Sequence, residues 1–218
     1  MTDAIAEARA DALWALSRLG APATVGDSRF ELIWRELLAA WSEPHRTYHN
    51  LDHLLSCLAE WRRGRDGSEA DAQVLLALLF HDAIYDPQAS DNEERSADWA
   101  ERAGAELGLP VAARAAISRM ILATEAHGRA ADEATRRLLD IDLSVLGADP
   151  ARFAAYDAGI RQEYRHLADE AYRQGRTRVL QSFLGREPIY LTASFRERHE
   201  VAARRNLAQA IRRLQTGA

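Results

Sequence analysis

Histidine and aspartate, which are common ligands of divalent cations, interrupt apolar stretches of this sequence at three places. The first place holds His49 and His53. Because these residues are four apart, a helix puts both imidazoles on one face, opposite a leucine stripe, and we expect that face to meet water or a cleft. Such a pair is a familiar metal geometry, although Asn50 cannot act as the glutamate base of the zinc-protease motif. The alternative is a surface pair without function.

The second place is the dipeptide His81–Asp82, which directly follows the apolar run 74–80. A run that is apolar on every side predicts a helix surrounded by protein. A carboxylate at the end of such a helix needs a cation, because an isolated buried charge costs many kcal/mol and the helix C-terminus is itself partly negative. A metal ion would supply that cation. The alternative is a helix cap or a salt bridge to an arginine.

The third place is Asp142, inside the apolar stripe of a helix expected over 132–146. Residues three and four positions away on both sides define the stripe: Leu138, Leu139, Val145 and Leu146. A carboxylate there needs a compensating charge, so Asp142 is a candidate metal ligand or, alternatively, a buried aspartate bonded to a tyrosine or an arginine. Asp140 points the other way, and we expect it at the surface or hydrogen-bonded to a ligand.

Apolar residues recur at three- and four-residue spacing along most of the chain, which predicts an all-α protein. Glycine and proline fall between the periodic segments, and they end three of the expected helices: Gly108 with Pro110, Gly128, and Gly147 with Pro150. Asp91, with Glu94 as a capping-box partner, and Asp132 stand at expected helix starts. The expected helices cover residues 3–19, 28–41, 48–62, 69–85, 91–107, 111–127, 132–146, 150–168, 170–184 and 193–214.

The composition indicates one acidic, packed domain over 1–218. The 218 residues are 47% hydrophobic and 28% charged, which supplies a core and is unlike a disordered chain. A net charge of -5 gives no overall attraction to a polyanion, so nucleic acid is disfavoured as the main partner.

The sequence has no segment typical of a membrane span or of export and has a single cysteine, and these features indicate its cellular compartment. The apolar run 74–80 is far shorter than the about 20 residues that a membrane span needs, and the N-terminus has no apolar targeting segment. The single cysteine, Cys57, excludes an intramolecular disulfide and fits a reducing compartment, with packing as its expected role. We therefore expect a cytoplasmic protein without a membrane partner.

The order His53, His81–Asp82, Asp142 resembles the H…HD…D signature of the HD superfamily of metal-dependent phosphohydrolases. Residues 48–53 resemble the YHN-x-x-H segment of cyclic-nucleotide phosphodiesterases, and 141–144 resemble their segment around the last aspartate. Over nearly its full length the chain resembles a bacterial branch identified as predicted metal-dependent HD phosphohydrolases. The residues that carry this resemblance are Arg46, Tyr48–Asn50, His53, Phe80–Asp82, Tyr85, Asp86, Ser90–Glu94, Leu139–Leu143, Ile160, Arg161, Glu163, Tyr164, Ile189 and Tyr190.

The resemblance implies an HD-domain bundle of about nine or ten helices with four metal ligands: His53, His81, Asp82 and Asp142. Two imidazoles and two carboxylates suit Mn, Fe, Zn, Co, Ni or Mg without choosing among them. The ion would activate a water that attacks a phosphate ester or anhydride, of a nucleotide or a related small molecule. His49 would protonate the leaving oxygen, and Asp82 could bridge to a second ion.

Five further residues could contact the substrate. Asp86, Asn92 and Glu93 follow the HD pair on a loop and a helix start, where specificity residues often lie, with capping as the alternative. His127 could contact phosphate or a second metal, or could equally be a core histidine. Arg161 could bind a phosphate oxygen, although a salt bridge is the favoured reading.

Two other functions stay open on the sequence. HD scaffolds also host di-iron oxygenases, but these need extra histidines, and only His127 stands between the HD pair and Asp142. A metal-bound sensor or interaction module without turnover would keep the ligands and would not need His49. A sensor therefore predicts no effect of His49→Ala, whereas a hydrolase predicts a large loss of turnover with the metal retained.

Overall fold

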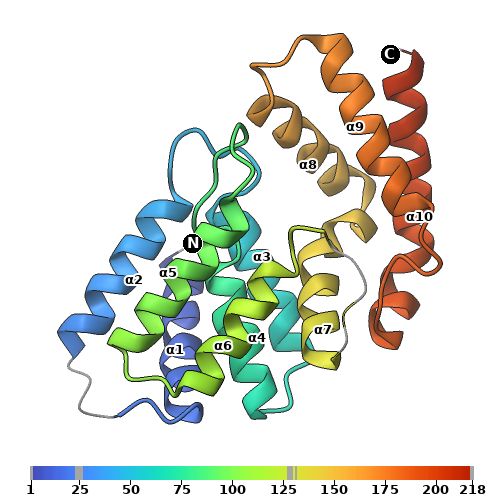
Figure 1. Cartoon of the computed structure of the whole chain (residues 1–218). Coiled ribbons are helices and arrows are strands. Elements are labelled where there is room, and N and C mark those ends of the chain that lie inside the picture. The colour runs from blue at the N-terminus through green and yellow to red at the C-terminus, as the bar shows by residue number, and fades with distance from the viewer. Residues whose placement is uncertain (1, 23–26, 127–129, 131, 217–218) are drawn as a thin grey trace. The chain divides into compact units, whose positions relative to one another are not determined.

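The computed structural model describes residues 2–22, 27–126, 130 and 132–216, and every regular element in these ranges is a helix (Figure 1). The all-α prediction is therefore confirmed, and each of the ten expected helices has a counterpart. The elements of this part of the chain are α1 (Thr2–Arg18), α2 (Asp27–Trp41), α3 (Leu51–Arg63), α4 (Glu69–Phe80), α5 (Asn92–Glu106), α6 (Val111–Leu122), α7 (Glu133–Asp142), the 3-10 helix η1 (Leu143–Gly147), α8 (Pro150–Glu163), α9 (Asp169–Leu184) and α10 (Ala193–Thr216).

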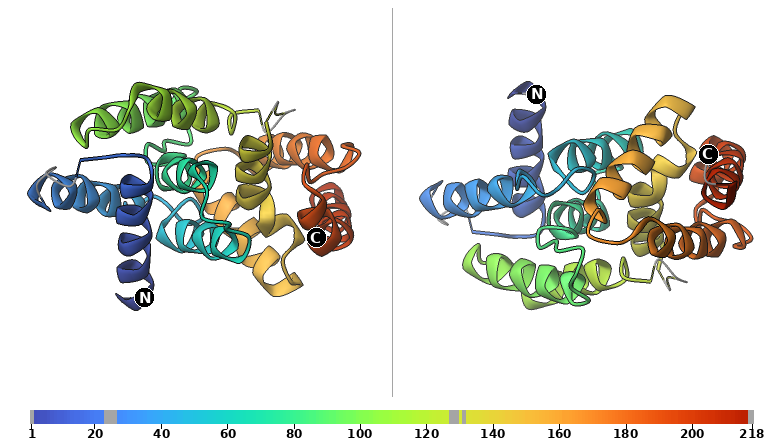
Figure 2. Two further views of the ribbon diagram at one scale, coloured as in Figure 1. Left: turned by 90° about the horizontal axis from the view of Figure 1, so that it is seen from below. Right: turned by 90° about the horizontal axis from the view of Figure 1, so that it is seen from above.

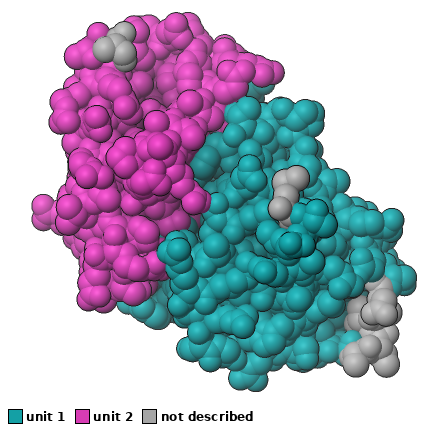
Figure 3. Space-filling view, turned by 180° about the vertical axis from the view of Figure 1, so that it is seen from behind, with its two compact units in different colours: residues 1–141 teal, residues 142–218 magenta. Residues whose placement is uncertain are grey.

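The chain divides into two compact units, Met1–Ile141 and Asp142–Ala218, which Figure 3 colours separately. The boundary falls one residue before the end of α7, so Asp142 ends that helix and opens the second unit. A single domain over 1–218 stays a prediction.

The apolar helix α4 is the centre of the first unit. Its residues from Val74 to Phe80 are all buried, as the sequence predicts for a helix surrounded by protein. Helices α1, α3, α5 and α6 pack against it, and α5 runs beside α6 (Figure 2). Burial of each large apolar side chain contributes about 1.5–3 kcal/mol, so this run helps to hold α4, and with it the residues that follow the helix, in place.

Caps set several helix ends, though not always as expected. The Asp132 carboxylate accepts a hydrogen bond from the backbone N–H of Thr135 (2.8 Å), which confirms its capping role. Gly108 follows α5 with a φ of 74°, a left-handed conformation that favours glycine. Asp91 precedes α5 but makes no capping hydrogen bond, so the expected capping box with Glu94 is wrong. The Asp91 backbone, at ψ 19°, lacks the extended conformation that a capping residue adopts.

In the second unit, α10 packs against α9 and η1. Buried polar side chains hold η1 in place: the Tyr190 hydroxyl donates to the Leu143 carbonyl (3.1 Å), and the Asn206 amide donates to the carbonyls of Leu146 and Ala148 (both 2.9 Å). Among the described residues, no helix combines the length and the apolar character needed to cross a membrane.

Candidate metal centre

Helix α3 begins at Leu51, three residues later than expected. Asn50 has an extended backbone, and its side-chain oxygen accepts hydrogen bonds from the backbone N–H groups of Asp52 (3.0 Å) and His53 (3.3 Å). Asparagine is among the preferred residues for this capping role. His49 therefore precedes the helix and His53 lies in its first turn, so the expected pairing of the two histidines on one helix face is wrong.

His53 faces the interior and is only 6% exposed, so of the two expected surroundings, water or a cleft, open water is wrong. Its ring lies 5.4 Å from the His81 ring and 6.2 Å from the Trp41 ring. Cys57, one turn later, places its sulfur 3.7 Å from His53 Nε2. The leucine stripe does not reveal this burial, because aromatic rings as well as leucines lie against α3.

Helix α4 ends at Phe80, whereas the sequence predicts residue 85. The imidazole of His81, 1% exposed, turns back so that Nδ1 lies 2.9 Å from the carbonyl oxygen of Leu78. That carbonyl belongs to the last helical turn, whose carbonyl groups have no N–H donor within the helix. The side chain of His81 thus caps the last turn of α4. Its other ring nitrogen, Nε2, faces His53 and Asp82.

The structure brings three predicted ligands together at this end of α4. His81 Nε2 lies 3.3 Å from His53 Nε2 and 3.2 Å from Asp82 Oδ2. His53 Nε2 lies 3.9 Å from the same carboxylate oxygen. We call His53, His81 and Asp82 the three-donor cluster, and their ligand atoms all fall within 4.8 Å of one another.

The hydrogen bond from His81 to Leu78 shows which ring nitrogen a neutral His81 protonates. Because a carbonyl only accepts, Nδ1 of His81 carries the proton, and Nε2 of the neutral ring carries a lone pair. That lone pair faces the Asp82 carboxylate and the His53 imidazole. Three potential electron-pair donors so close together could bind one divalent cation, which can contact all three atoms where one proton links only two.

The spacing of the donors fits a metal ion. Ligand atoms about 2.1 Å from one tetrahedral or octahedral cation are about 3.0–3.4 Å from one another. Two of the distances, 3.2 and 3.3 Å, lie in this range, and the third, 3.9 Å, exceeds it. The cluster could therefore hold a divalent cation, and a complete coordination shell needs ligands beyond these three.

The position of Asp142 at the unit boundary leaves its role as the fourth ligand a prediction. The helix stops at this residue and η1 follows, so the expected α-helical stripe through Val145 and Leu146 is wrong. Asp140 is 1% exposed, so a surface position is wrong and the alternative, a hydrogen bond to a ligand, stays a prediction. Asp140 lies three residues after Arg137 and therefore on the same side of α7. The Arg137 guanidinium donates to the Trp61 carbonyl of α3 (3.0 Å), so this side of α7 faces α3.

His49 lies beside the three-donor cluster. Its ring centroid is 6.0 Å from that of His53 and 4.2 Å from that of Tyr85. The ring of Tyr48 contacts both histidine rings, at 4.9 Å and 4.8 Å between centroids. The loop before α3 thus brings an imidazole close to the candidate metal ligands without adding it to the cluster.

The other proposed substrate contacts near the HD pair have structural partners. The Asn92 side chain accepts from the backbone N–H of Asp86 (3.0 Å) and donates to its carbonyl (2.9 Å), which closes the loop 86–92. The Asp86 carboxylate accepts from the backbone N–H of Gln88 (2.9 Å). Glu93 is half-buried in the first turn of α5. His127 lies outside the described residues, so its two readings stay open.

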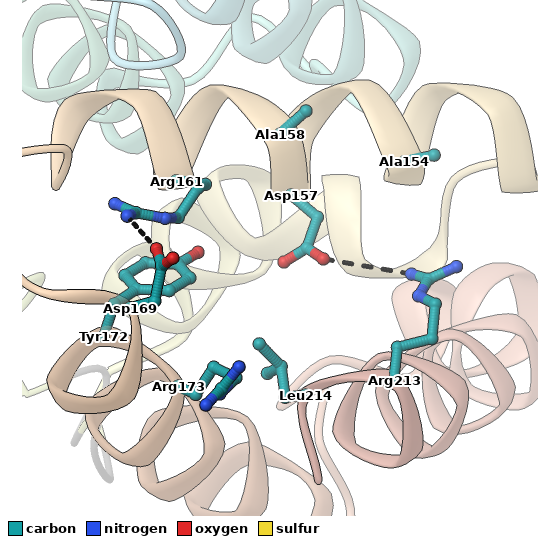
Figure 4. A pocket seen from close by; sticks show the side chains of 9 residues that line it. All are labelled: Ala154, Asp157, Ala158, Arg161, Asp169, Tyr172, Arg173, Arg213 and Leu214. Carbon is teal, nitrogen blue, oxygen red and sulfur yellow. Dashed lines mark hydrogen bonds and ion pairs between the residues drawn. The ribbon is translucent and has the colours of Figure 1, made fainter. Parts of the chain in front are cut away.

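Arg161 belongs to the second unit, at the edge of a cavity of about 370 Å³ between α8, α9 and α10 (Figure 4). Its guanidinium donates to the Asp169 carboxylate (2.5 Å) and lies over the Tyr172 ring, 4.6 Å from the centroid. Arg213, also in this cavity, lies 3.8 Å from Asp157. These carboxylates support the salt-bridge alternative, and phosphate binding by Arg161 stays a prediction.

Sequence reasoning gave little weight to three residues around the cluster. Cys57, expected only to pack, also contacts a candidate ligand. Tyr85 and Arg46 entered only as motif positions, yet the Tyr85 ring contacts the His49 ring and the Arg46 side chain is buried beside Tyr85. Their places in the segments Arg46-x-Tyr48-His49 and His81-Asp82-x-x-Tyr85 are the signal that could have drawn attention to them.

Comparison with known proteins adds no name to this arrangement. No protein-family model matches the chain, and no curated protein and no solved structure matches it. The geometry of the cluster therefore carries the functional argument.

Proposed function

We propose that this chain is a metal-dependent phosphohydrolase whose three-donor cluster binds the catalytic divalent cation. The convergence of two imidazole nitrogens and one carboxylate oxygen within 3.9 Å supports the proposal. The proposal includes Asp142 as a fourth ligand, since it ends the helix that carries Arg137 and the buried Asp140. It also includes a cytosolic location, which suits the free thiol of Cys57.

The ligand set suits the chemistry of phosphate ester hydrolysis. A bound divalent cation lowers the pKa of water and neutralises phosphate charge. His81 and His53 are buried, so they exclude bulk water from one side of the site, while the half-buried Asp82 marks the side from which a substrate can approach. Mixed nitrogen and oxygen ligands accept Mn, Fe, Co, Ni, Zn or Mg, and the proposal extends to one or two ions.

His49 is the proposed proton donor to the leaving oxygen. Its ring lies next to the cluster, 6.0 Å from the His53 ring, and it contacts the Tyr85 ring at 4.2 Å between centroids, which limits its orientation. An imidazole is suited to this role because it titrates near neutral pH. Positioned general acids of this kind typically contribute 10²–10⁴-fold to the rate.

A nucleotide is the substrate class that the resemblance to the HD superfamily suggests, and a panel of substrates tests it. The purified chain is incubated with nucleoside mono-, di- and triphosphates, cyclic nucleotides and generic phosphate esters, each with Mn, Co, Ni, Zn or Mg. We expect hydrolysis of at least one member by the unaltered chain. Asp82→Ala should abolish both hydrolysis and metal binding, because it removes one of the three converging donors.

His49→Ala separates catalysis from metal binding in the same assay. We expect it to bind metal as the unaltered chain does and to lose about 10²–10⁴-fold in turnover. Full activity of Asp82→Ala would refute the proposed centre. Metal binding without hydrolysis of any member would instead favour the oxygenase, if iron is bound and oxygen consumed, or the sensor, if neither occurs.

A further inference from the structure

A buried arginine lies where the loop before α3 meets the turn after α4. The side chain of Arg46 is 0% exposed to solvent, although the loop around it lies largely at the surface. A guanidinium keeps its charge in proteins, so its burial is tolerated only when its five N–H groups are paired. The identity of those partners indicates what the residue does.

All five N–H groups of Arg46 have acceptors, and three of these are backbone carbonyls. Nη1 donates to the carbonyls of His49 (3.2 Å) and Asp82 (2.5 Å). Nη2 donates to the carbonyl of Ala83 (3.0 Å). The remaining donors, on Nε and Nη2, both lie 2.9 Å from the Glu43 carboxylate. One side chain thus ties the backbone of the proposed acid to the backbone of a proposed ligand.

Two aromatic rings fix the plane of this guanidinium. It lies 5.7 Å from the centroid of Trp41 and 5.6 Å from that of Tyr85. Trp41 in turn contacts the His81 ring, at 5.5 Å between centroids, and Tyr85 contacts the His49 ring, at 4.2 Å. Arg46 therefore touches both the backbone and the aromatic neighbours of the candidate centre, without belonging to the three-donor cluster.

We infer that Arg46 is a positioning residue of the proposed metal centre. It sets the distance between the loop that carries His49 and the turn that carries Asp82, and this role rests on the proposed function. The carbonyls of Asp82 and Ala83 follow the C-terminus of α4, where a cation is favourable and partners are otherwise scarce. A ligand held within about 0.5 Å of its productive position needs such support.

The planar fork of arginine is what this site requires. A lysine would preserve the positive charge, but a single ammonium group cannot address three carbonyls and a carboxylate from one position. Arg46→Lys thus tests geometry with the charge retained, and Arg46→Met removes both. If charge alone mattered, the lysine would rescue the site.

The test is Co²⁺ affinity, measured by titration of the metal-free full chain, together with the visible spectrum of the bound Co²⁺. Arg114→Lys is the matched control, because Arg114 likewise ties two segments of the first unit through the Leu109 carbonyl (3.1 Å) and the Glu101 carboxylate. All variants are measured well below their unfolding temperatures. We expect Arg46→Lys and Arg46→Met to weaken Co²⁺ binding about 10–100-fold and to alter the spectrum, whereas Arg114→Lys changes neither.

The outcomes separate the positioning role from the proposed function. Affinities of both Arg46 variants within twofold of the unaltered chain, with an unchanged spectrum, would show that Arg46 supports only the fold. Full rescue by the lysine would overturn the argument from geometry. If the unaltered chain binds no Co²⁺, Mn²⁺ or Zn²⁺, the proposed metal centre itself fails and the positioning role fails with it.

Discussion

One aspartate is buried in the first turn of α4 and another is partly buried just after its last residue, and the two carboxylates have different partners. At the N-terminal end, Asp71 is 0% exposed, and its carboxylate pairs with the guanidinium of Arg137 and accepts from the backbone N–H of Gly67 (2.7 Å). At the C-terminal end, Asp82 faces the imidazoles of His53 and His81. A carboxylate paired with arginine is complete within the protein, whereas one that meets imidazole lone pairs is suited to a cation from solution.

Arginine also occurs at the second end, which sharpens the contrast. Arg46 lies next to Asp82 but donates to the backbone carbonyl of that residue. The protein therefore uses its buried arginine there to hold the chain, and the carboxylate oxygen is directed toward the two histidines. This difference distinguishes a structural buried aspartate, in the first turn of α4, from a candidate ligand just after the end of the same helix.

Asp71→Ala should give the largest loss of stability. The substitution leaves Arg137 as an uncompensated, largely buried charge and removes the acceptor of the Gly67 N–H, so we expect the free energy of unfolding to fall by about 3–5 kcal/mol. Denaturant unfolding followed by circular dichroism measures this loss.

The double variant Asp71→Leu with Arg137→Met is the control for that experiment. Because it removes both charges together, it should recover most of the stability that the single substitution loses. A loss below about 1 kcal/mol for Asp71→Ala would show that the two ends of α4 are less different than their contacts indicate.

Metal binding should stabilise the chain through the other end of α4. At a Co²⁺ concentration about 100 times the Kd, we expect the free energy of unfolding to rise by about 2.7 kcal/mol, since the ion binds the folded chain. Asp82→Asn should abolish this increase, and a chelator should reverse it in the unaltered chain. The control Asp91→Asn, an exposed carboxylate before α5, should keep the increase. A Co²⁺ effect that survives in Asp82→Asn would locate the ion elsewhere.

The sequence predicts the helices well because each is specified locally. Apolar spacing and flanking caps, glycines and prolines lie within a few residues of each boundary, and the pattern needs no knowledge of distant contacts. The apolar run of α4 and the cap at Asp132 are clear examples. The order of His53, His81 and Asp82 likewise predicts three residues that the fold brings together.

The errors occur where distant residues decide the outcome. The early end of α4 coincides with hydrogen bonds from Arg46, 36 and 37 positions away, to the carbonyls of Asp82 and Ala83. Periodicity cannot reveal such partners. A surface position for Asp140 is wrong because one apolar stripe implies one buried face, whereas the contacts of Arg137 show that a second side of α7 also packs within the first unit. The cap at Asn50 is, by contrast, a local signal, because asparagine directly precedes the first residue of α3.

Asp132→Ala should have the smallest effect of the three substitutions that test this comparison, because its carboxylate caps α7 at the surface. The hydrogen bond from the Thr135 backbone N–H lowers the pKa of Asp132 below its ordinary value of 3.8. A lowered pKa means that the stabilisation is present above pH 3.8 and is lost as the pH falls through the folded-state value. We expect Asp132→Ala to cost about 1 kcal/mol of unfolding free energy at pH 7, and progressively less below pH 3.8.

Asp132→Asn keeps a capping oxygen, so it should retain most of the stability at pH 7 without this pH dependence. An alanine penalty that persists undiminished at pH 2, measured by denaturant unfolding, would show that the charge of the carboxylate contributes nothing to the cap.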